Sequence, residues 1–491
     1  MREHLFQLPP TGTGNLQTRV RKMLVDTILG GQLPPGTTLP SCRRLAKQLG
    51  IARNTVVLAY QHLVDDGFLE SRERSGFYVA DSVLDGHAPR ATGEPDLSNT
   101  TPPNWQGRIQ VAATSLAVPH KPLDWQEFRY PFVYGQVDPD LFPLAEWREC
   151  SREALSVRSV REWARDRVDH DDEELLEQLQ TRVLPRRGVW ARREEILVTL
   201  GAQQALYLLA ALLIGKQHTV GIEEPGYADA RNILSLHAGR MRYLDVDNDG
   251  LIPDTNLHGC DYVYTTPSHQ CPTTVTMPMA RREALLEAAA RHDVVIIEDD
   301  YESETNYDGP PAPALRSIDA SGRVLYVGSL SKSLAPGLRL GYLVAPAEIV
   351  REARALRRFM LRHPPANNER AVALFLSRGH HDALLRRLAQ AFKRRWVTLG
   401  NALAQHLPDA LKVQGLGGTS FWIHGPEGLD ANALRTEAQK HGVLIERGDV
   451  FYGREQYPSN AFRLGFSAIA ENRISDGVAA LAHVMPSVIR H

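Results

Sequence analysis

The stretch Gly328–Tyr342 (GSLSKSLAPGLRLGY) places one lysine, Lys332, in a run of small and hydroxyl-bearing residues. A buried lysine without a neighbouring carboxylate has a destabilised ammonium, so its pKa falls and its amine becomes a nucleophile toward carbonyls. Ser329 and Ser331 carry hydroxyls suited to a phosphate, and Arg339 carries paired donors suited to the same group. The same pattern also fits a surface loop with a solvated lysine, so the rest of the chain has to decide between the two.

Length and composition narrow the choices. A chain of 491 residues is long enough for about three domains. Hydrophobic residues make up 43% and charged residues 23%, which is typical of a soluble globular protein, and the net charge of −2 requires any nucleic-acid-binding face to be local. We find no signal-peptide core, no apolar run long enough for a bilayer, and four scattered cysteines without a CxxC pair. We therefore expect no membrane segment, no metal site and a cytoplasmic location.

The segment from about Leu16 to Ala80 predicts three short helices followed by a hairpin. LQTRVRKMLVDTILGG is amphipathic, and its apolar face consists of Leu16, Val20, Met23, Leu24, Thr27 and Ile28. Ser41 stands at the N-cap of a second helix, CRRLAKQLG, and Arg53-Asn54-Thr55 open a third, VVLAYQHLVDDG. FLESRERSGFYVA predicts two strands around a turn at Ser75-Gly76. This order is that of a winged helix-turn-helix.

The charge of this segment suits DNA. The start of the third helix projects Arg53, Asn54 and Thr55, where base edges and phosphates are met in helix-turn-helix proteins. Basic residues outnumber acidic ones and comprise Arg19, Arg21, Lys22, Arg43, Arg44, Lys47, Arg53, Arg72 and Arg74. The alternative is a small helical domain whose basic residues are only solvated.

A long motif resolves that alternative. The chain carries G-x-L-x-P-G-x-x-L-P-S-x-R-x-L-A-x-x-L-G-x-x-R-x-T-V-x-x-A-Y-x-x-L-x-x-x-G-x-L between Gly31 and Leu69, and this resembles the GntR-family winged helix. The resemblance implies a DNA-binding domain over residues 13–80 whose contacts come from Ser41, Arg43, Arg53, Asn54, Thr55 and Gly76. Ala52 and Val57 depart from residues common in the family, so the operator sequence cannot be carried over.

Beyond this domain the composition shifts twice. Residues 81–124 are rich in Pro, Gly, Ser and Thr, which predicts a linker. Residues 125–491 alternate helical runs with short apolar strands such as EEILVTL, TVGIEEP, DVVIIEDD and GRVLYVGS. This alternation predicts an α/β domain with a mixed, mostly parallel buried sheet, and ligands gather at the carboxyl ends of such strands. The last segments, GTSFWIHG, GVLIERGD and NAFRLGFS, predict a small C-terminal α+β subdomain.

Two strand ends in this domain carry groups suited to a phosphorylated, ring-containing cofactor. Gly201-Ala202-Gln203 form a turn that aims backbone N–H groups at an anion, although a plain helix entry looks the same. VVIIEDDYESE ends a strand with Asp299, and an ionised Asp near a pyridine nitrogen keeps that nitrogen protonated. The alternative for Asp299 is a solvated acidic loop.

Two further residues fit the same site. Tyr227 follows a strand in EEPGYADAR, where an aromatic ring can stack on a flat cofactor, although a core tyrosine fits equally well. Arg463 in FRLGFS suits a two-pronged grip on a carboxylate, or it is a surface arginine on a strand.

Together these features resemble the fold-type I aminotransferases, and the whole chain resembles the MocR/GabR-type regulators, in which a GntR-like winged helix precedes such a domain. The resemblance implies pyridoxal 5′-phosphate (PLP) bound to Lys332, with Asp299 at the pyridine nitrogen, Tyr301 at the ring hydroxyl and Tyr227 stacked on the ring. Its phosphate would be held by Gly201, Ala202, Gln203, Ser329, Ser331 and Arg339. Arg463 would take the carboxylate of an amino-acid ligand, and the site would lie in a homodimer.

Residues that bind the substrate in fold-type I aminotransferases are altered in this sequence, and these differences decide between a regulator and an enzyme. The family's D-x-x-G-x-x-x-L-R segment is degraded between Val168 and Leu175, and Asp229 lies where some relatives place a basic ligand-binding residue. We therefore favour a PLP-dependent transcriptional regulator that senses an amino acid or amine through external aldimine formation. The alternative is a working aminotransferase with an accessory DNA-binding domain, in which Lys332 is also the general base.

Overall fold

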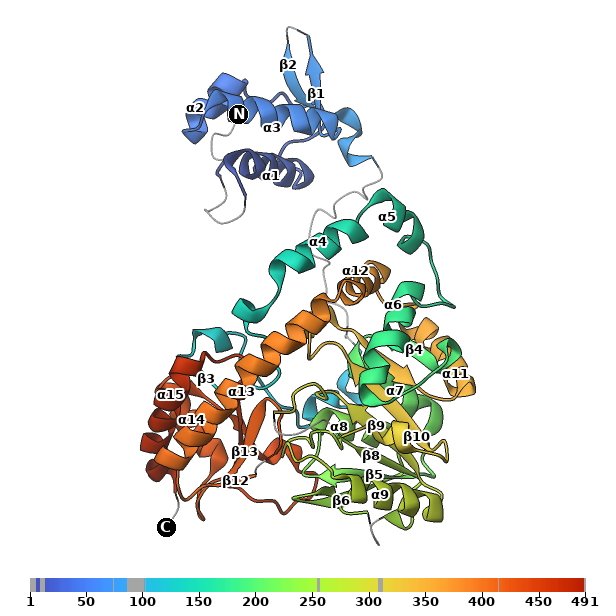
Figure 1. Cartoon of the computed structure of the whole chain (residues 1–491). Coiled ribbons are helices and arrows are strands. Elements are labelled where there is room, and N and C mark those ends of the chain that lie inside the picture. Colours follow the sequence, from blue (N-terminus) through green and yellow to red (C-terminus); the bar gives the residue numbers. More distant parts are fainter. Residues whose placement is uncertain are drawn as a thin grey trace. The chain divides into compact units, whose positions relative to one another are not determined.

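The computed structural model describes residues 6–8, 14–73, 75–85, 101, 103–253, 257–307, 312–413 and 415–489 (Figure 1). Residue 13, Arg74 and residues 86–100 of the expected linker, all named in the sequence predictions, lie outside these ranges. The chain divides into two compact units, residues 1–109 and residues 110–491. Each unit is described by itself.

The first unit, drawn in blue in Figure 1, is the predicted winged helix-turn-helix. Its elements are α1 (Leu16–Leu29), α2 (Cys42–Leu49), α3 (Arg53–Asp65), β1 (Leu69–Arg72) and β2 (Gly76–Val79). Ser41 caps α2 by accepting a hydrogen bond from the backbone N–H of Arg44 at 3.3 Å. Gly50 ends α2 at φ +64°, a left-handed conformation that favours glycine. Strands β1 and β2 pair antiparallel as the wing.

The core of this unit follows the predicted face of α1, with one exception. Val20, Met23, Leu24, Thr27 and Ile28 are buried, whereas Leu16 is 43% exposed. The prediction for Leu16 was therefore wrong, because the packed part of the helix begins one turn after its first residue.

The second unit is built on an eight-stranded mixed sheet. Its strands, in spatial order, are β4 (Ile196–Thr199), β11 (Gly341–Val344), β10 (Val324–Ser329), β9 (Val295–Asp300), β8 (Tyr262–Thr265), β5 (Thr219–Glu224), β6 (Arg240–Asp247) and β7 (Gly250–Leu251). The pairs from β10 through β9, β8 and β5 to β6 are parallel, and β11 and β7 run antiparallel to their neighbours. This confirms the predicted mixed, mostly parallel sheet.

Helices cover both faces of this sheet, so its central strands are buried along nearly their whole length, including the acidic residues at the ends of β5 and β9. The helices before the C-terminal part are α4 (Leu144–Ala154), α5 (Val157–Trp163), α6 (Glu173–Gln178), α7 (Gly201–Leu213), α8 (Ala228–His237), α9 (Met279–His292), α10 (Leu315–Ile318), α11 (Ala347–Leu361) and α12 (Ala366–Ser377). One buried cluster joins α7, α8 and α11 to the sheet, and another includes α9 on the opposite face.

The predicted C-terminal α+β subdomain is present. It contains α13 (His380–His406), β12 (Leu411–Val413), β13 (Ser420–His424), α14 (Ala431–Lys440), β14 (Val443–Leu444), β15 (Glu446–Arg447), β16 (Ala461–Gly465) and α15 (Glu471–Val484). Strands β12, β13, β16 and β15 form an antiparallel sheet, while β14 pairs with β3 (Tyr130–Pro131). Arg463 and Glu446 face each other in the β15–β16 register, which places both beside the carboxyl ends of the large sheet's strands.

The boundary between linker and second domain differs from the sequence prediction. We expected a linker over residues 81–124, but residues 110–124 group with the second unit. Two side chains of that unit, Asn232 and Arg435, donate hydrogen bonds to the carbonyls of Ala117 and His120 at 2.9 and 3.4 Å. The composition of this segment does not predict the packing, because the second unit holds the segment by hydrogen bonds to its backbone carbonyls, which every residue type carries.

No helix in the described part of the chain is both long and apolar enough to cross a membrane.

The degraded segment ahead of the phosphate turn contains a buried ion-pair network. Asp171 accepts hydrogen bonds from Arg357 at 2.6 Å and from Arg354 at 2.7 Å, and the Asp171 and Arg357 side chains are fully buried. Asp172 caps α6 and pairs with Arg370 at 2.9 Å. These aspartates hold α6, α11 and α12 together.

We predict that Asp171→Asn destabilises the second unit by about 3 kcal/mol, the lower end of the cost of breaking a buried ion pair. Arg357 would be left without its anion, although burial and the neighbouring Asp171 raise the pKa of Glu369, which can ionise in the variant and offset part of the loss. Urea denaturation followed by fluorescence measures the change. Asp169→Asn is the matched control, because Asp169 is 71% exposed and 3.7 Å from Arg358. Equal midpoints for the two variants would contradict the prediction.

Candidate functional site

The start of α3 presents the predicted DNA-contacting groups to solvent. Arg53 and Asn54 are exposed, Thr55 is half-buried, and no side chain caps the helix at Ala52. The first N–H groups of α3 are therefore available to a phosphate. Arg43 on α2 is exposed as well.

Ser41 and Gly76 each have a structural role in the winged helix that is compatible with the DNA contact predicted for them. The Ser41 oxygen caps α2, which leaves its hydroxyl proton free for a phosphate oxygen. Gly76 begins β2 at φ +108° with open space where a Cβ would lie, so conformation rather than crowding favours glycine at this point of the wing.

A cavity of about 140 Å³ opens in the second unit where β9, β10 and the start of α7 meet. It is lined by Tyr134, Ala202, Gln203, Tyr227, Cys271, Asp299, Tyr301, Ser329, Ser331, Lys332, Pro336 and Arg339. The lining includes every predicted cofactor residue except Gly201. That glycine, at φ +74°, leaves room for Arg339, whose Nη2 would lie 2.8 Å from a Cβ at position 201.

Lys332 reaches the cavity as an amine rather than as one half of an ion pair. Its side chain is partly exposed because it lines the cavity, and it makes no ion pair with a described residue. Burial lowers the pKa of Lys332, with Glu302 opposing and Arg463 assisting that shift. Its Nζ lies 4.3 Å from the centre of the Tyr134 ring. These surroundings fit a nucleophilic amine.

Two adjacent carboxylates on β9 have opposite environments. Burial raises the pKa of Asp299 to about 7, although Tyr264 donates a hydrogen bond to its Oδ2 at 2.8 Å. Burial would do the same to Asp300, but Arg187 binds its Oδ2 at 2.7 Å and brings the pKa of Asp300 below the usual value. The Oδ1 atom of Asp299 is buried and has no hydrogen-bond partner among the described residues. Asp299 therefore needs a donor from a ligand.

The predicted phosphate-binding groups other than Gly201 also line the cavity. Arg339 is exposed and donates to the Leu200 carbonyl at 3.2 Å. The Ser329 hydroxyl has no described hydrogen-bond partner. Ser331 differs, because its hydroxyl donates to the carbonyl of Leu340 and accepts from the N–H of the same residue, both at 3.1 Å. Ser331 would have to reorient its hydroxyl to serve a phosphate.

The two tyrosines predicted to contact the cofactor ring, Tyr227 and Tyr301, are both held by hydrogen bonds. The Tyr227 hydroxyl donates to Asp229 at 3.1 Å, and Gln203 donates to the same carboxylate at 2.7 Å. Tyr301 donates to the carbonyl of His269 at 2.8 Å, which leaves its oxygen free to accept. Asp229 therefore orients Tyr227 and Gln203.

Arg463 is not free as the sequence suggested. It is fully buried, and its Nε and Nη2 bind one oxygen of Glu446 at 2.8 and 2.6 Å. Its Cζ lies 4.0 Å from the centre of the Tyr134 ring, and its Nη1 faces Cys271 Sγ at 4.0 Å. Only Nη1 remains available to a ligand without a rearrangement.

Sequence reasoning missed Tyr134, Cys271, Glu446 and Lys121. Tyr134 lies under both Lys332 and Arg463, and its only sequence signal is a Tyr-Gly pair after a short strand. Glu446 follows β14, and an acid opposite a predicted ligand-binding arginine cannot be found without the strand register.

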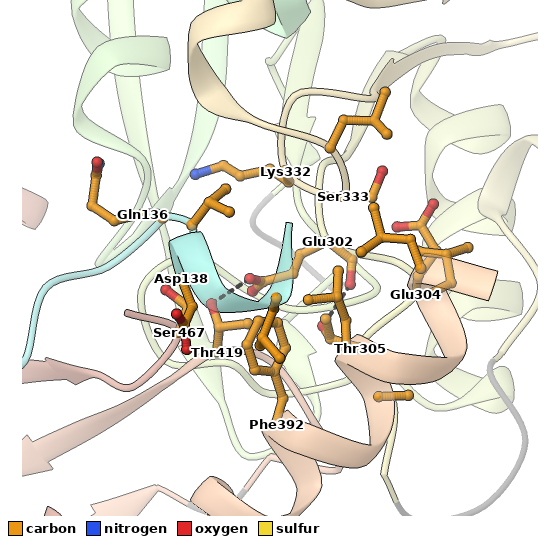
Figure 2. A pocket seen from close by; sticks show the side chains of 18 of the residues that line it. Gln136, Asp138, Glu302, Glu304, Thr305, Lys332, Ser333, Phe392, Thr419 and Ser467 are labelled. Atoms are coloured by element: carbon orange, nitrogen blue, oxygen red, sulfur yellow. Dashed lines mark hydrogen bonds between the residues drawn. The ribbon is translucent and has the colours of Figure 1, made fainter. Parts of the chain in front are cut away.

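A second, smaller cavity of about 40 Å³ lies on the other side of Lys332 (Figure 2). Glu302 points into it and accepts a hydrogen bond from Thr419, while Leu384, Leu388 and Phe392 form an apolar wall. Burial raises the pKa of Glu302. This cavity also borders Lys332, and its volume is too small for a cofactor.

The larger cavity fits the PLP that the sequence resemblance implies. The unpartnered Asp299 oxygen suits a protonated ring nitrogen, Lys332 suits an aldehyde, and the start of α7 with Ser329 and Arg339 suits a phosphate. Within the described residues, no three His, Cys, Asp or Glu side chains are grouped to hold a metal ion.

Comparisons with known proteins agree with both units. Residues 16–79 match the gntR family of bacterial regulatory proteins, and residues 138–481 match class I and II aminotransferases. The HTH-type transcriptional regulator TauR of Rhodobacter capsulatus is 42% identical over 98% of each chain. The probable rhizopine catabolism regulatory protein MocR of Rhizobium meliloti is 29% identical over 92% of this chain and 90% of its own.

Solved structures match the second unit. The α-aminoadipate aminotransferase LysN of Thermus thermophilus, complexed with N-(5′-phosphopyridoxyl)-L-leucine, has a TM-score of 0.66 and 26% identity, covering 78% of this chain and 96% of its own. That protein's pocket holds a phosphopyridoxyl group joined to an amino acid.

We predict that Arg53→Ala weakens specific DNA binding by about 1–3 kcal/mol, because Arg53 is exposed at the start of the recognition helix. Fluorescence anisotropy with operator DNA selected from a random pool measures the loss at fixed salt. Arg21→Ala is the matched control, since Arg21 carries the same charge on α1, where it pairs with Asp66 at 2.7 Å. An equal loss in both variants would mean that Arg53 contributes only charge.

Proposed function

The chain belongs to the class I and II aminotransferase family and, with its gntR-family domain, to the MocR/GabR-type transcriptional regulators, and from this we propose that it binds PLP and responds to an amino compound. The protein is a DNA-binding transcriptional regulator. The cofactor, the class of effector and the roles of single residues are the parts proposed.

The proposed cofactor site assigns each residue one task. When bound, PLP would supply an aldehyde that is reactive toward primary amines such as that of Lys332. Asp299 would hold the proton of the ring nitrogen, Tyr227 would stack on the ring, and Tyr301 would hydrogen-bond the ring hydroxyl. The N–H groups at Gly201–Gln203 hold the phosphate with Ser329, Ser331 and Arg339.

The observation that carries this proposal is the buried Asp299 oxygen that has no partner among the described residues, in a cavity that Lys332 and Arg339 also line. A buried carboxylate oxygen that lacks a donor costs stability, so a ligand that supplies one is favoured. The carboxyl edge of a sheet covered on both faces is where such ligands bind.

We further propose that Arg463 contributes to binding the acid group of the effector and that the protein acts as a homodimer on DNA. Lys332 lies 4.3 Å and Arg463 4.0 Å from the same Tyr134 ring centre, so amine and acid of a small molecule reach both. An effector changes DNA binding only if it binds two conformations of the protein with different affinity.

Regulation without turnover is favoured over transamination. Arg463, the expected substrate anchor, already binds Glu446 through two of its nitrogens, which weakens its hold on a substrate carboxylate. The first turn of α3 is meanwhile fully arranged for DNA, as described above.

We predict that Lys332→Ala purifies without the near-visible absorbance of protein-bound PLP, because Lys332 is the one lysine among the described residues that line the cavity. Nonspecific DNA binding should remain, since the winged helix keeps its own core. Absorbance spectra after addition of PLP and gel filtration measure the first result. Lys440→Ala is the control, because Lys440 lies on the surface of α14 and pairs with Glu437. A band of full height in Lys332→Ala would remove Lys332 as the anchor.

A further inference from the structure

One cationic side chain, that of Lys121 near the start of the second unit, lies beside residues that line the cavity without lining it itself. Residues 110–124 are fastened to the second unit at consecutive points, through the carbonyls of Ala117 and His120 and through Lys121. The Lys121 ammonium donates a hydrogen bond to the carbonyl of Tyr134, the residue whose ring contacts both Lys332 and Arg463. Its side chain is 27% exposed, so it is neither a surface lysine nor sealed in the core.

Lys121 and Lys332 meet at Gly135. A Cβ placed on Gly135 would lie 2.6 Å from Nζ of Lys332 and 3.9 Å from Nζ of Lys121. Both amines therefore lie near the position that a side chain at residue 135 would occupy. A molecule whose amine replaces that of Lys332 would bring its next few atoms toward Lys121.

The charges around this space do not balance. Glu446 binds Arg463 through Oε2, while its Oε1 accepts from the Tyr134 N–H at 3.3 Å and lies 3.7 Å from Lys121 Nζ. One carboxylate thus serves two cations. Burial lowers the pKa of Lys121 to about 8, against the attraction of Glu446 and with repulsion from Lys332 and Arg463. An added anion would restore the balance.

Position 229, just after the residue predicted to stack on the cofactor, does not supply positive charge. Position 229, two residues after Tyr227, is an aspartate that accepts hydrogen bonds from Gln203 and Tyr227. It cannot attract an acid group. Arg463 already binds Glu446 through two nitrogens and contacts Cys271 through the third, so a second cation nearby would strengthen the binding of an anionic effector.

We propose that Lys121 is a second anchor, beside Arg463, for the acid group of an amino-acid effector, and that effector binding thereby alters how residues 110–124 are held. The proposal rests on the proposed function and narrows its ligand class to compounds that carry both an amine and an anionic group a short distance apart. Lys121 would then exchange its contacts with the Tyr134 carbonyl and Glu446 for the ligand's anion. Residues 110–124 follow the DNA-binding unit in the sequence. The change in the contacts of Lys121 would therefore couple ligand binding directly to the segment that connects the two units.

The test compares three small probes on the PLP-loaded full chain. Ethylamine carries only the amine, while L-alanine and β-alanine add a carboxylate on one or the other carbon. Absorbance titrations give the half-saturating concentration of each probe. For Lys121→Gln we expect this concentration to rise about tenfold for at least one alanine isomer, as for a lost charge-assisted hydrogen bond, and to stay within about twofold for ethylamine. Lys121→Arg should recover most of the loss, and Lys440→Gln should change none of the three.

Several results would overturn the proposal. Equal shifts for ethylamine and both alanines would make Lys121 a structural residue, and unchanged values for all three would place it outside the ligand site. If the wild-type band is present but no probe carrying an acid binds better than ethylamine, the narrowed ligand class is wrong while PLP binding stands. If the wild-type protein has no band, the proposed function itself fails.

Hydrogen exchange tests the link to the tether. In the wild-type protein, saturating β-alanine should change amide exchange within residues 110–124, because Lys121 leaves the Tyr134 carbonyl. In Lys121→Gln at its own saturating concentration the same amides should not respond. An identical response in both proteins would separate the segment from the ligand and overturn that part of the proposal.

Discussion

Removal of Asp299 and Lys332 from water is the constraint on which the second unit depends. A carboxylate and an amine at strand ends would be unremarkable in solvent, and they become reactive partners for a cofactor only because helices cover both faces of the sheet. Burial raises the pKa of one and lowers that of the other. Both shifts oppose the charged forms of these groups, and the proposed ligand, with a ring-nitrogen proton and an aldehyde, would offset both.

Several other buried charged residues near the cavity are paired with one another. Arg187 neutralises Asp300 and so leaves Asp299 as the carboxylate that faces the cavity. Asp171 and its arginines tie together the helices beside the phosphate turn. Glu446 binds Arg463 through two of its nitrogens, so the proposed binding of an effector's acid group to Arg463 would be weak and reversible. Weak, reversible binding suits a sensor better than commitment of a substrate to turnover.

Much of this arrangement was accessible from the sequence because its residues lie in local motifs. Lys332, Gly201 and Asp299 each lie within or next to an apolar strand, and the winged helix has a long motif with fixed spacing. What escaped prediction depends on contacts between distant segments. Tyr134 meets Arg463 and Lys121 meets Glu446 across most of the domain, and no periodicity in either segment marks them. The predicted linker, residues 81–124, extends into the second unit for the same reason, because composition does not show which backbone carbonyls accept hydrogen bonds from other segments.

The most direct test of the account uses thermodynamic linkage between the two units. The near-visible band of the PLP-loaded protein is titrated with an amino-acid effector, with and without saturating operator DNA, while keto acid is assayed in the same samples. If ligand and DNA are coupled, DNA must shift the ligand's half-saturation by the same factor by which the ligand shifts DNA affinity. We predict such a shift with no accumulation of keto acid. Superimposable titrations, or keto acid formed turnover after turnover, would contradict a sensor and favour an enzyme.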